Sequence, residues 1–162
     1  MRPVRLPESI VAEIRRHGRE SYPDECCGFL IAPTEPVDAE GARSIVAMER
    51  APNAFEGERR RRFVIRPEEL RTAERALEGT GRTVAGFYHS HPDHPARPSE
   101  FDQAHAWPWY TYLVVSVTAT EIPAIGAFEL DAESGVFHEV PLGTTPAGEV
   151  QVTESLRARG SS

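Results

Sequence analysis

The sequence predicts an α/β fold, in which β-prone segments and amphipathic helices alternate along the chain. Residues 84–88 and 110–118 are apolar and rich in β-branched and aromatic side chains, which is typical of buried strands. Residues 6–22 and 67–79 instead place apolar side chains at near-helical spacing, with charged side chains on the other side. The 162 residues correspond to one domain that is long enough to bury its own core.

The N-terminal half is expected to contain one helix and three strands. The helix over 6–22 should end at Pro23, because proline cannot continue a helix. The following apolar segment, 25–32, is predicted to be a buried strand. Alternating apolar residues over 43–50 indicate a second strand, and 63–66 is predicted to be a third, short one.

The C-terminal half is predicted to contain two further helices and four strands. Pro67 at a first helical position, followed by two glutamates, starts a helix that runs to about Gly79. The other expected elements are a strand over 83–90, a helix over 99–107, a strand over 110–118 and a hairpin of 124–131 with 135–140. From residue 143 the chain is rich in Gly, Thr, Pro, Ser and Arg, so the domain is assigned to 1–142 and 143–162 to a flexible tail.

Three candidate metal ligands, His89, His91 and Asp102, lie within one short stretch. Residues i and i+2 of a strand point to the same side, so the two histidines can face one point. The spacing of Ser99 and Asp102 is that of a capping box, which would place the carboxylate about one turn into a helix. Each part alone has an ordinary structural interpretation, as a packed histidine pair and as a helix cap.

The number of these ligands favours a catalytic site over a structural one. Structural zinc sites close all four positions with protein ligands, whereas catalytic sites keep one position for water. Two histidines and one carboxylate also describe the facial triad of non-haem iron(II) oxygenases, which remains an alternative.

The order His-x-His-Pro, followed at a fixed spacing by Ser-x-x-Asp, resembles the JAMM motif of the MPN-plus metallopeptidases. A second match is the segment 24–31, where Glu25 precedes an apolar strand that contains glycine. The resemblance covers about residues 5–141 and is closest to the short bacterial members that act on ubiquitin-like sulfur-carrier proteins. It implies a mixed, mainly antiparallel curved sheet flanked by helices, related to the cytidine-deaminase-like layout.

The resemblance also implies a role for each residue of the motif. His89, His91 and Asp102 would bind Zn²⁺, which lowers the pKa of bound water to about 7. Glu25 would accept a proton from the water and return it to the leaving amine. Ser99 would donate a hydrogen bond to the carbonyl oxygen of the substrate.

The expected substrate is a ubiquitin-like or sulfur-carrier protein with a C-terminal Gly-Gly, cleaved at the amide or isopeptide bond after that tail. The chain has no long insertion downstream of the motif, which favours a small carrier over polyubiquitin. A homodimer is compatible with the sequence. A non-catalytic MPN-type scaffold for protein interactions is the main alternative, although such scaffolds lack the metal ligands that this chain retains.

Composition excludes several other classes of protein. The formal charge is −7 and all 18 basic residues are arginine, so the basic face of a nucleic-acid-binding protein is not expected. No run of 18 apolar residues and no secretory segment is evident, so a cytoplasmic protein without a membrane span is predicted. The adjacent Cys26 and Cys27 are interpreted as a buried, reduced pair.

Four consecutive arginines, 59–62, have two interpretations. They are either a solvated loop or a contact surface for an acidic partner. Under the second interpretation, Arg59 and Arg60 are candidate substrate-binding residues, which would attract the acidic surface of a carrier.

Overall fold

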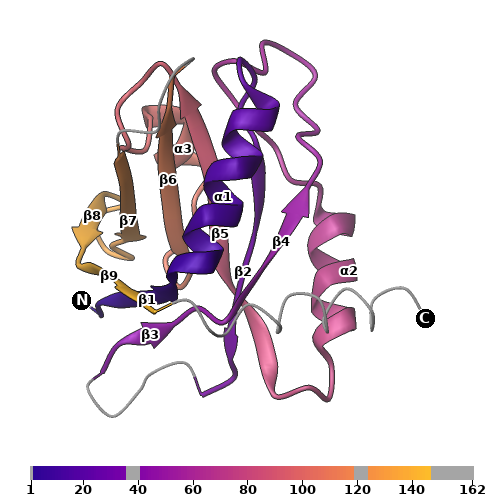
Figure 1. Cartoon of the computed structure of the whole chain (residues 1–162), viewed down its shortest axis with the longest axis vertical. Coiled ribbons are helices and arrows are strands. Elements are labelled where there is room, and N and C mark those ends of the chain that lie inside the picture. Colours follow the sequence, from indigo (N-terminus) through magenta and orange to yellow (C-terminus); the bar gives the residue numbers. More distant parts are fainter. Residues whose placement is uncertain (1, 36–40, 119–123, 147–162) are drawn as a thin grey trace.

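A computed structural model describes residues 2–35, 41–118 and 124–146, and its main feature is a six-stranded sheet (Figure 1). In spatial order the strands are β4 (Ala47–Ala51), β2 (Cys27–Pro33), β5 (Arg82–Pro92), β6 (Thr111–Val117), β7 (Ala124–Leu130) and β8 (Phe137–Val140). Only β5 and β6 pair in parallel, and every other neighbouring pair in this sheet is antiparallel. The prediction of a mixed α/β fold with a mainly antiparallel sheet is therefore confirmed.

The helices lie on both faces of this sheet. Helix α1 (Glu8–Ser21) packs its apolar side against one face, where Ile14 joins the buried cluster of Leu113. Helix α2 (Pro67–Leu77) contributes Leu77 to the cluster on the other face, which contains Val114. Burial of each such side chain contributes roughly 1.5–3 kcal/mol. The third helix, α3 (Glu100–Ala104), is short, and among the described residues no helix is long and apolar enough to cross a membrane.

A second, smaller sheet changes three of the predicted boundaries. It consists of β3 (Arg43–Ser44), β1 (Val4–Pro7) and β9 (Leu142–Thr145), paired in parallel. The helix therefore begins at Glu8 and not at residue 6, and the strand expected over 43–50 is divided between β3 and β4. Residues 142–145 lack a strong strand signal in the sequence and form a strand because β1 supplies their backbone partners. Strand β9 also runs past residue 142, where the domain is predicted to end, and 147–162 lie outside the described residues.

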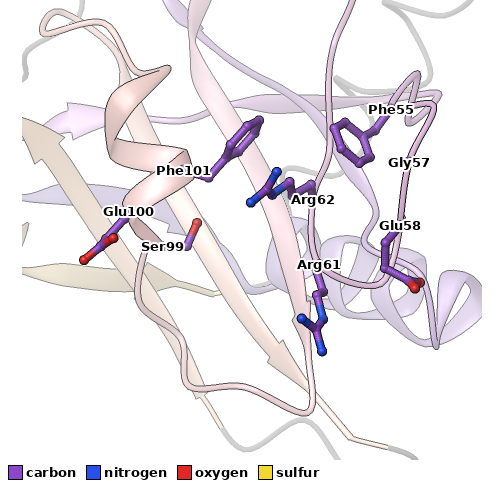
Figure 2. A pocket seen from close by; sticks show the side chains of 8 residues that line it. All are labelled: Phe55, Gly57, Glu58, Arg61, Arg62, Ser99, Glu100 and Phe101. Atoms are coloured by element: carbon purple, nitrogen blue, oxygen red, sulfur yellow. The ribbon is translucent and has the colours of Figure 1, made fainter.

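The strand predicted over 63–66 is wrong. These residues belong to a loop between β4 and α2, which Asn53 holds by accepting a hydrogen bond from the Val64 N–H (3.1 Å). The apolar side chains that suggested a strand, Phe63 and Ile65, instead pack against the cluster under α2. Figure 2 shows this loop lying opposite α3.

Two glycines allow β5 to lie close to its neighbours. A Cβ atom on Gly86 would lie 1.9 Å from the Thr111 carbonyl oxygen of β6, and one on Gly28 would lie 2.3 Å from the Tyr88 ring. The buried Tyr88 hydroxyl reaches His17 of α1 at 2.8 Å. Burial lowers the pKa of His17 to about 4, with a further contribution from Arg50, so the imidazole is neutral near pH 7. These contacts position the strand that carries the site.

Candidate metal centre and active site

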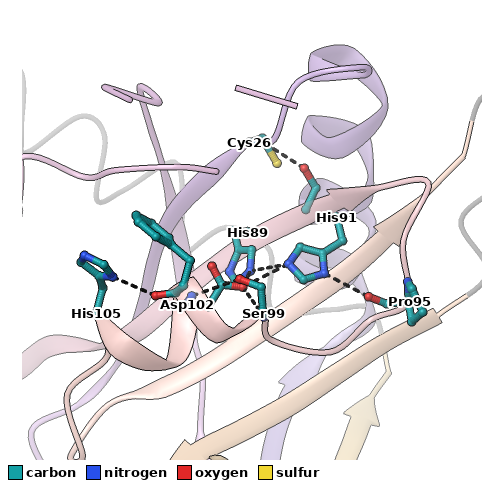
Figure 3. Close-up of polar contacts among 9 residues, drawn as sticks. Cys26, His89, His91, Pro95, Ser99, Asp102 and His105 are labelled. Atoms are coloured by element: carbon teal, nitrogen blue, oxygen red, sulfur yellow. Dashed lines mark hydrogen bonds and ion pairs between the residues drawn. The ribbon is translucent and has the colours of Figure 1, made fainter. Parts of the chain in front are cut away.

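His89 and His91 project from the same side of β5, as the alternation of a strand requires. Both side chains are buried, and their Nε2 atoms are 3.2 Å apart. The intervening Ser90 belongs to the opposite side, where its hydroxyl accepts a hydrogen bond from the Cys26 N–H (2.8 Å). Figure 3 shows the two imidazoles turned toward Asp102.

Asp102 reaches the two histidines because a capping box orients it at the start of α3. The Ser99 hydroxyl accepts from the Asp102 N–H (3.0 Å), and the Ser99 N–H donates to Asp102 Oδ2 (2.8 Å). The same Oδ2 atom lies 3.0 Å from His89 Nε2 and 3.1 Å from His91 Nε2. In this one position, the Asp102 carboxylate can both complete the helix cap and act as a metal ligand.

These three atoms form a donor set that fits a divalent cation. Metal–ligand distances of about 2.0–2.2 Å with tetrahedral angles place neighbouring donors about 3.4 Å apart. The separations of 3.0–3.2 Å in the structure are close to that value. His91 Nδ1 lies 3.0 Å from the Pro95 carbonyl oxygen, to which it can only donate. In a neutral ring this leaves a lone pair on Nε2 facing the carboxylate, an arrangement that a cation between them stabilises.

The protonation states of this cluster also suit a metal. Burial lowers the pKa of His89, although the nearby Asp102 acts in the opposite direction. For Asp102, burial acts to raise the pKa, but the two histidines and the Ser99 N–H outweigh it and hold the pKa well below its usual range. Neutral imidazole and ionised carboxylate are the forms that bind metal ions.

Glu25 lies beside the cluster, immediately before β2, and its side chain is only 3% exposed. One ligand atom each of Glu25, His89 and His91 lie within 4.8 Å of one another. Its Oε1 atom is buried and has no hydrogen-bond partner among the described residues. Burial, and then the charge of Asp102, raise the pKa of Glu25 to about 9. A cation in the cluster would lower the pKa of Glu25, because it stabilises the ionised carboxylate.

Two neighbours outside the motif hold the backbone of Glu25. The Glu25 N–H donates to the Arg59 carbonyl oxygen (2.7 Å), and the Glu25 carbonyl oxygen accepts from Asn53 Nδ2 (3.1 Å). The Asn53 side chain also donates to the Arg62 carbonyl oxygen (3.0 Å) and accepts from the Phe55 and Val64 N–H groups. Asn53 is thus a positioning residue that sequence reasoning missed, because these contacts depend on how the loop folds.

We expect replacement of Asn53 by aspartate to reduce kcat by about 10- to 100-fold, since misplacement of a catalytic group by about 1 Å has costs of this order. Aspartate keeps the acceptor atoms but turns an oxygen toward the carbonyls of Glu25 and Arg62. Steady-state kinetics should show a larger change in kcat than in KM, with metal content unchanged. Thr72→Ala, which removes a hydrogen bond on exposed α2, is the control. A normal kcat in Asn53→Asp would contradict this role.

Ser99 lies at the edge of a hollow of about 430 Å³, which α3 shares with the loop before α2 (Figure 2). Its hydroxyl oxygen accepts from the helix, so its proton stays available for a further acceptor. The other side chains at this hollow include Phe55, Arg61, Arg62 and Phe101. The predicted catalytic serine is therefore open to a ligand.

A second, larger hollow of about 580 Å³ lies between α2 and the candidate metal ligands. His89 and Asp102 are among its lining residues, and the Phe63 ring stacks on the His89 ring with centroids 4.5 Å apart. Most of its wall is apolar and includes Phe63, Ile65, Leu70, Phe87, Trp107 and Tyr112. An apolar segment of a substrate can therefore approach the site from this side. Trp107 is part of this wall, whereas Trp109 is not among the lining residues.

The four consecutive arginines divide into two pairs. All four are exposed, but only Arg61 and Arg62 line the hollow beside Ser99. Arg59 Nε donates to the Phe55 carbonyl oxygen of its own loop (2.9 Å). The structure therefore places Arg61 and Arg62 beside Ser99. Arg59 and Arg60, which are the candidates from the sequence, lie outside this hollow.

The remaining histidines and cysteines lie apart from the donor set. His94 is exposed, and His105, whose Nδ1 lies 2.8 Å from the Phe101 carbonyl oxygen, lines the apolar hollow but is not one of the three donors. Cys26 and Cys27 are buried free thiols, as expected. Burial raises the pKa of Cys26 to about 11, which leaves its thiol protonated near pH 7.

Fold and site together define a protein of the JAB/MPN class. Residues 7–130 match the family model described as prokaryotic homologs of the JAB domain, and the chain belongs to this family. It is 34% identical over 110 residues to the desampylase of Haloferax volcanii, a match that covers 67% of this chain and 74% of that relative.

The chain is also similar to several solved structures. A protein from Salinibacter ruber is 36% identical with a TM-score of 0.65, and the match covers 87% of this chain and 91% of that one. For a protein from Desulfitobacterium hafniense the identity is 25%, the TM-score 0.75 and the coverage 90% and 95%. A JAB1/MPN domain protein from Archaeoglobus fulgidus, at 18% identity, a TM-score of 0.50 and coverage of 88% and 99%, supports the fold alone.

Proposed function

We propose that this protein is a zinc-dependent metallopeptidase that hydrolyses the amide or isopeptide bond after the C-terminal Gly-Gly of a ubiquitin-like or sulfur-carrier protein. The observation that carries the proposal is the buried Glu25 carboxylate, whose Oε1 has no hydrogen-bond partner in the described part of the chain, beside three atoms arranged as metal ligands. The relation to the desampylase supports a hydrolase of the JAB family that deconjugates ubiquitin-like proteins.

In this proposal His89, His91 and Asp102 hold the metal, and Glu25 and Ser99 act on the substrate. When bound, zinc would supply Lewis-acid polarisation of the carbonyl and a lowered pKa for water. Glu25 accepts a proton from the attacking water and then transfers it to the leaving nitrogen. The Ser99 hydroxyl donates to the carbonyl oxygen as negative charge develops on it. The surrounding burial keeps bulk water away and strengthens these interactions.

The apolar hollow provides a path for the acyl side of the substrate. Its lining includes His89 and Asp102, so a tail that occupies it could bring its last carbonyl to the site. Glycine residues suit this part of the hollow, because they carry no side chain that must fit beside the stacked His89 and Phe63 rings. The residues before the Gly-Gly would then lie against the apolar wall, with a carrier body outside it.

The direct test is incubation of zinc-loaded protein with a ubiquitin-like carrier that carries an amide-linked extension after its Gly-Gly, followed by intact-mass spectrometry. We expect loss of the extension and release of a carrier that ends in Gly-Gly. Polyubiquitin chains should be cleaved much more slowly, since the chain has no long insertion to hold a second ubiquitin. If the metal-loaded protein cleaves neither substrate, the proposed activity is wrong.

Arg59 and Arg60 are proposed to attract acidic carriers, and exposed charges act over only about 8–10 Å at 0.10–0.15 M salt. We therefore expect Arg60→Glu to reduce kcat/KM for a carrier most strongly at low salt and to leave a short tail peptide unaffected. Arg59→Glu is less clean, since the Arg59 side chain also holds its own loop. A loss that is equal for both substrates and independent of salt would show that this pair is structural.

A further inference from the structure

The hollow beside Ser99 has a positively charged wall. Arg61 and Arg62 both line it, and the Arg62 guanidinium lies over the Phe101 ring at 4.5 Å from the centroid. A cation–π contact of this kind holds the guanidinium plane while leaving its N–H donors available. Figure 2 shows the Arg61 and Arg62 side chains on the side of the loop that faces α3, with Ser99 on α3 opposite them.

Neither guanidinium is neutralised by the part of the chain that the structure describes. Two carboxylates, Glu58 and Glu100, also line the hollow, yet neither forms an ion pair with an arginine there. In Figure 2 both carboxylates point away from the arginines. By contrast, Arg71 of the apolar hollow is within ion-pair distance of Glu68 (3.9 Å). The free positive charge near the site is therefore concentrated beside Ser99.

The two hollows border different groups of the candidate site. The apolar one reaches His89 and Asp102, the charged one reaches Ser99, and of the residues that the structure describes only Phe101 lines both. A substrate that spans the scissile bond needs one region for its acyl side and another for the part that is released. An apolar wall suits the carrier tail, whereas unpaired guanidinium groups suit an anion on the released part.

We propose that Arg61 and Arg62 form a subsite for the free α-carboxylate of the released residue. This inference rests on the proposed function and narrows its substrate class to carriers that end in a short, linear peptide extension after Gly-Gly. Hydrolysis adds water across the amide bond: the water oxygen joins the glycine carbonyl carbon, the C–N bond breaks, and the released amino acid leaves with its amine protonated and its carboxylate on the arginines. An isopeptide-linked protein presents no carboxylate at that position.

The test uses one carrier with two C-terminal ends that differ only in charge. Semisynthesis supplies the carrier ending Gly-Gly-Ala as a free acid and as the carboxamide. We expect kcat/KM of the wild-type protein to be at least about 10-fold higher for the acid, in line with hydrogen bonds to a charged group. In the double variant Arg61→Gln/Arg62→Gln, cleavage of the acid should fall to the level of the amide. Arg19→Gln/Arg75→Gln, which replaces two exposed arginines of α1 and α2 outside both hollows, is the charge-matched control and should keep the preference.

The outcomes separate this subsite from the proposed function. Equal cleavage of acid and amide by the wild-type protein would overturn the subsite and leave the function intact. Failure to cleave either substrate would count against the function itself. A third substrate, ending Gly-Gly-Glu as the carboxamide, tests the source of the carboxylate: if it is cleaved as well as the acid, the arginines bind an acidic side chain and the α-carboxylate assignment is wrong. The comparison within the wild-type protein does not depend on the folding of any variant.

Discussion

Replacement of Glu25 by glutamine is expected to leave zinc bound and to reduce kcat by at least the ~10²–10⁴-fold typical of a lost general acid–base group. Glutamine has nearly the same shape, so the buried position before β2 should tolerate it, but it cannot accept a proton. Asp102 lies within 3.1 Å of both imidazole nitrogens, whereas the Glu25 ligand atom is only placed within 4.8 Å of them. We therefore propose Asp102, whose distances to both imidazoles are those of a ligand, as the third ligand and Glu25 as the base.

Two measurements on the same preparation check this assignment. Elemental analysis should show about one zinc per chain in both proteins, and the kinetics of carrier cleavage should show the loss. A Glu25→Gln protein with normal turnover would refute the role of proton carrier. A protein that instead loses its zinc would make Glu25 a ligand and would require another base.

Removal of one metal ligand, by His89→Ala or Asp102→Ala, is expected to abolish most zinc binding. Asp102→Ala also breaks the capping box of α3, since the carboxylate accepts from the Ser99 N–H. Ser99→Ala is therefore the matched control: it removes the other half of the box, which costs about 1 kcal/mol, but leaves every proposed ligand in place. The control should keep its zinc although its activity falls.

Metal content and thermal unfolding with added metal measure this effect. A ligand that binds only the folded state raises stability by RT ln(1 + [L]/Kd), so zinc should raise the Tm of wild type and of Ser99→Ala but not of the two ligand variants. Full zinc retention by both ligand variants would rule out this donor set. Iron in the purified protein would favour the facial-triad alternative, and a protein without affinity for any divalent metal would favour a scaffold.

Local signals in the sequence were sufficient for most of the elements. The runs of β-branched residues in β5 and β6, and Pro67 at the start of α2, act through side-chain shape and backbone dihedral angles within a few residues. Where a partner distant in sequence supplied the hydrogen bonds, as for β1 and β9, the sequence carried no such signal. For the same reason the strand predicted over 63–66 does not form, because the Asn53 side chain takes the place of a neighbouring strand and accepts from the Val64 N–H.

The sequence by itself determined which side chains carry the chemistry: His89 and His91 share a side because a strand alternates, and Asp102 follows Ser99 at the spacing of a cap. Only the tertiary structure decided how these groups meet. The pairing of β5 with β2 and β6 buries His89, and the approach of α3 brings Asp102 to it. The fold of the loop before α2 ties Glu25 to Asn53 and turns Arg61 and Arg62 toward Ser99. Contacts of this kind depend on packing between segments far apart in the chain, which no local pattern of residues encodes.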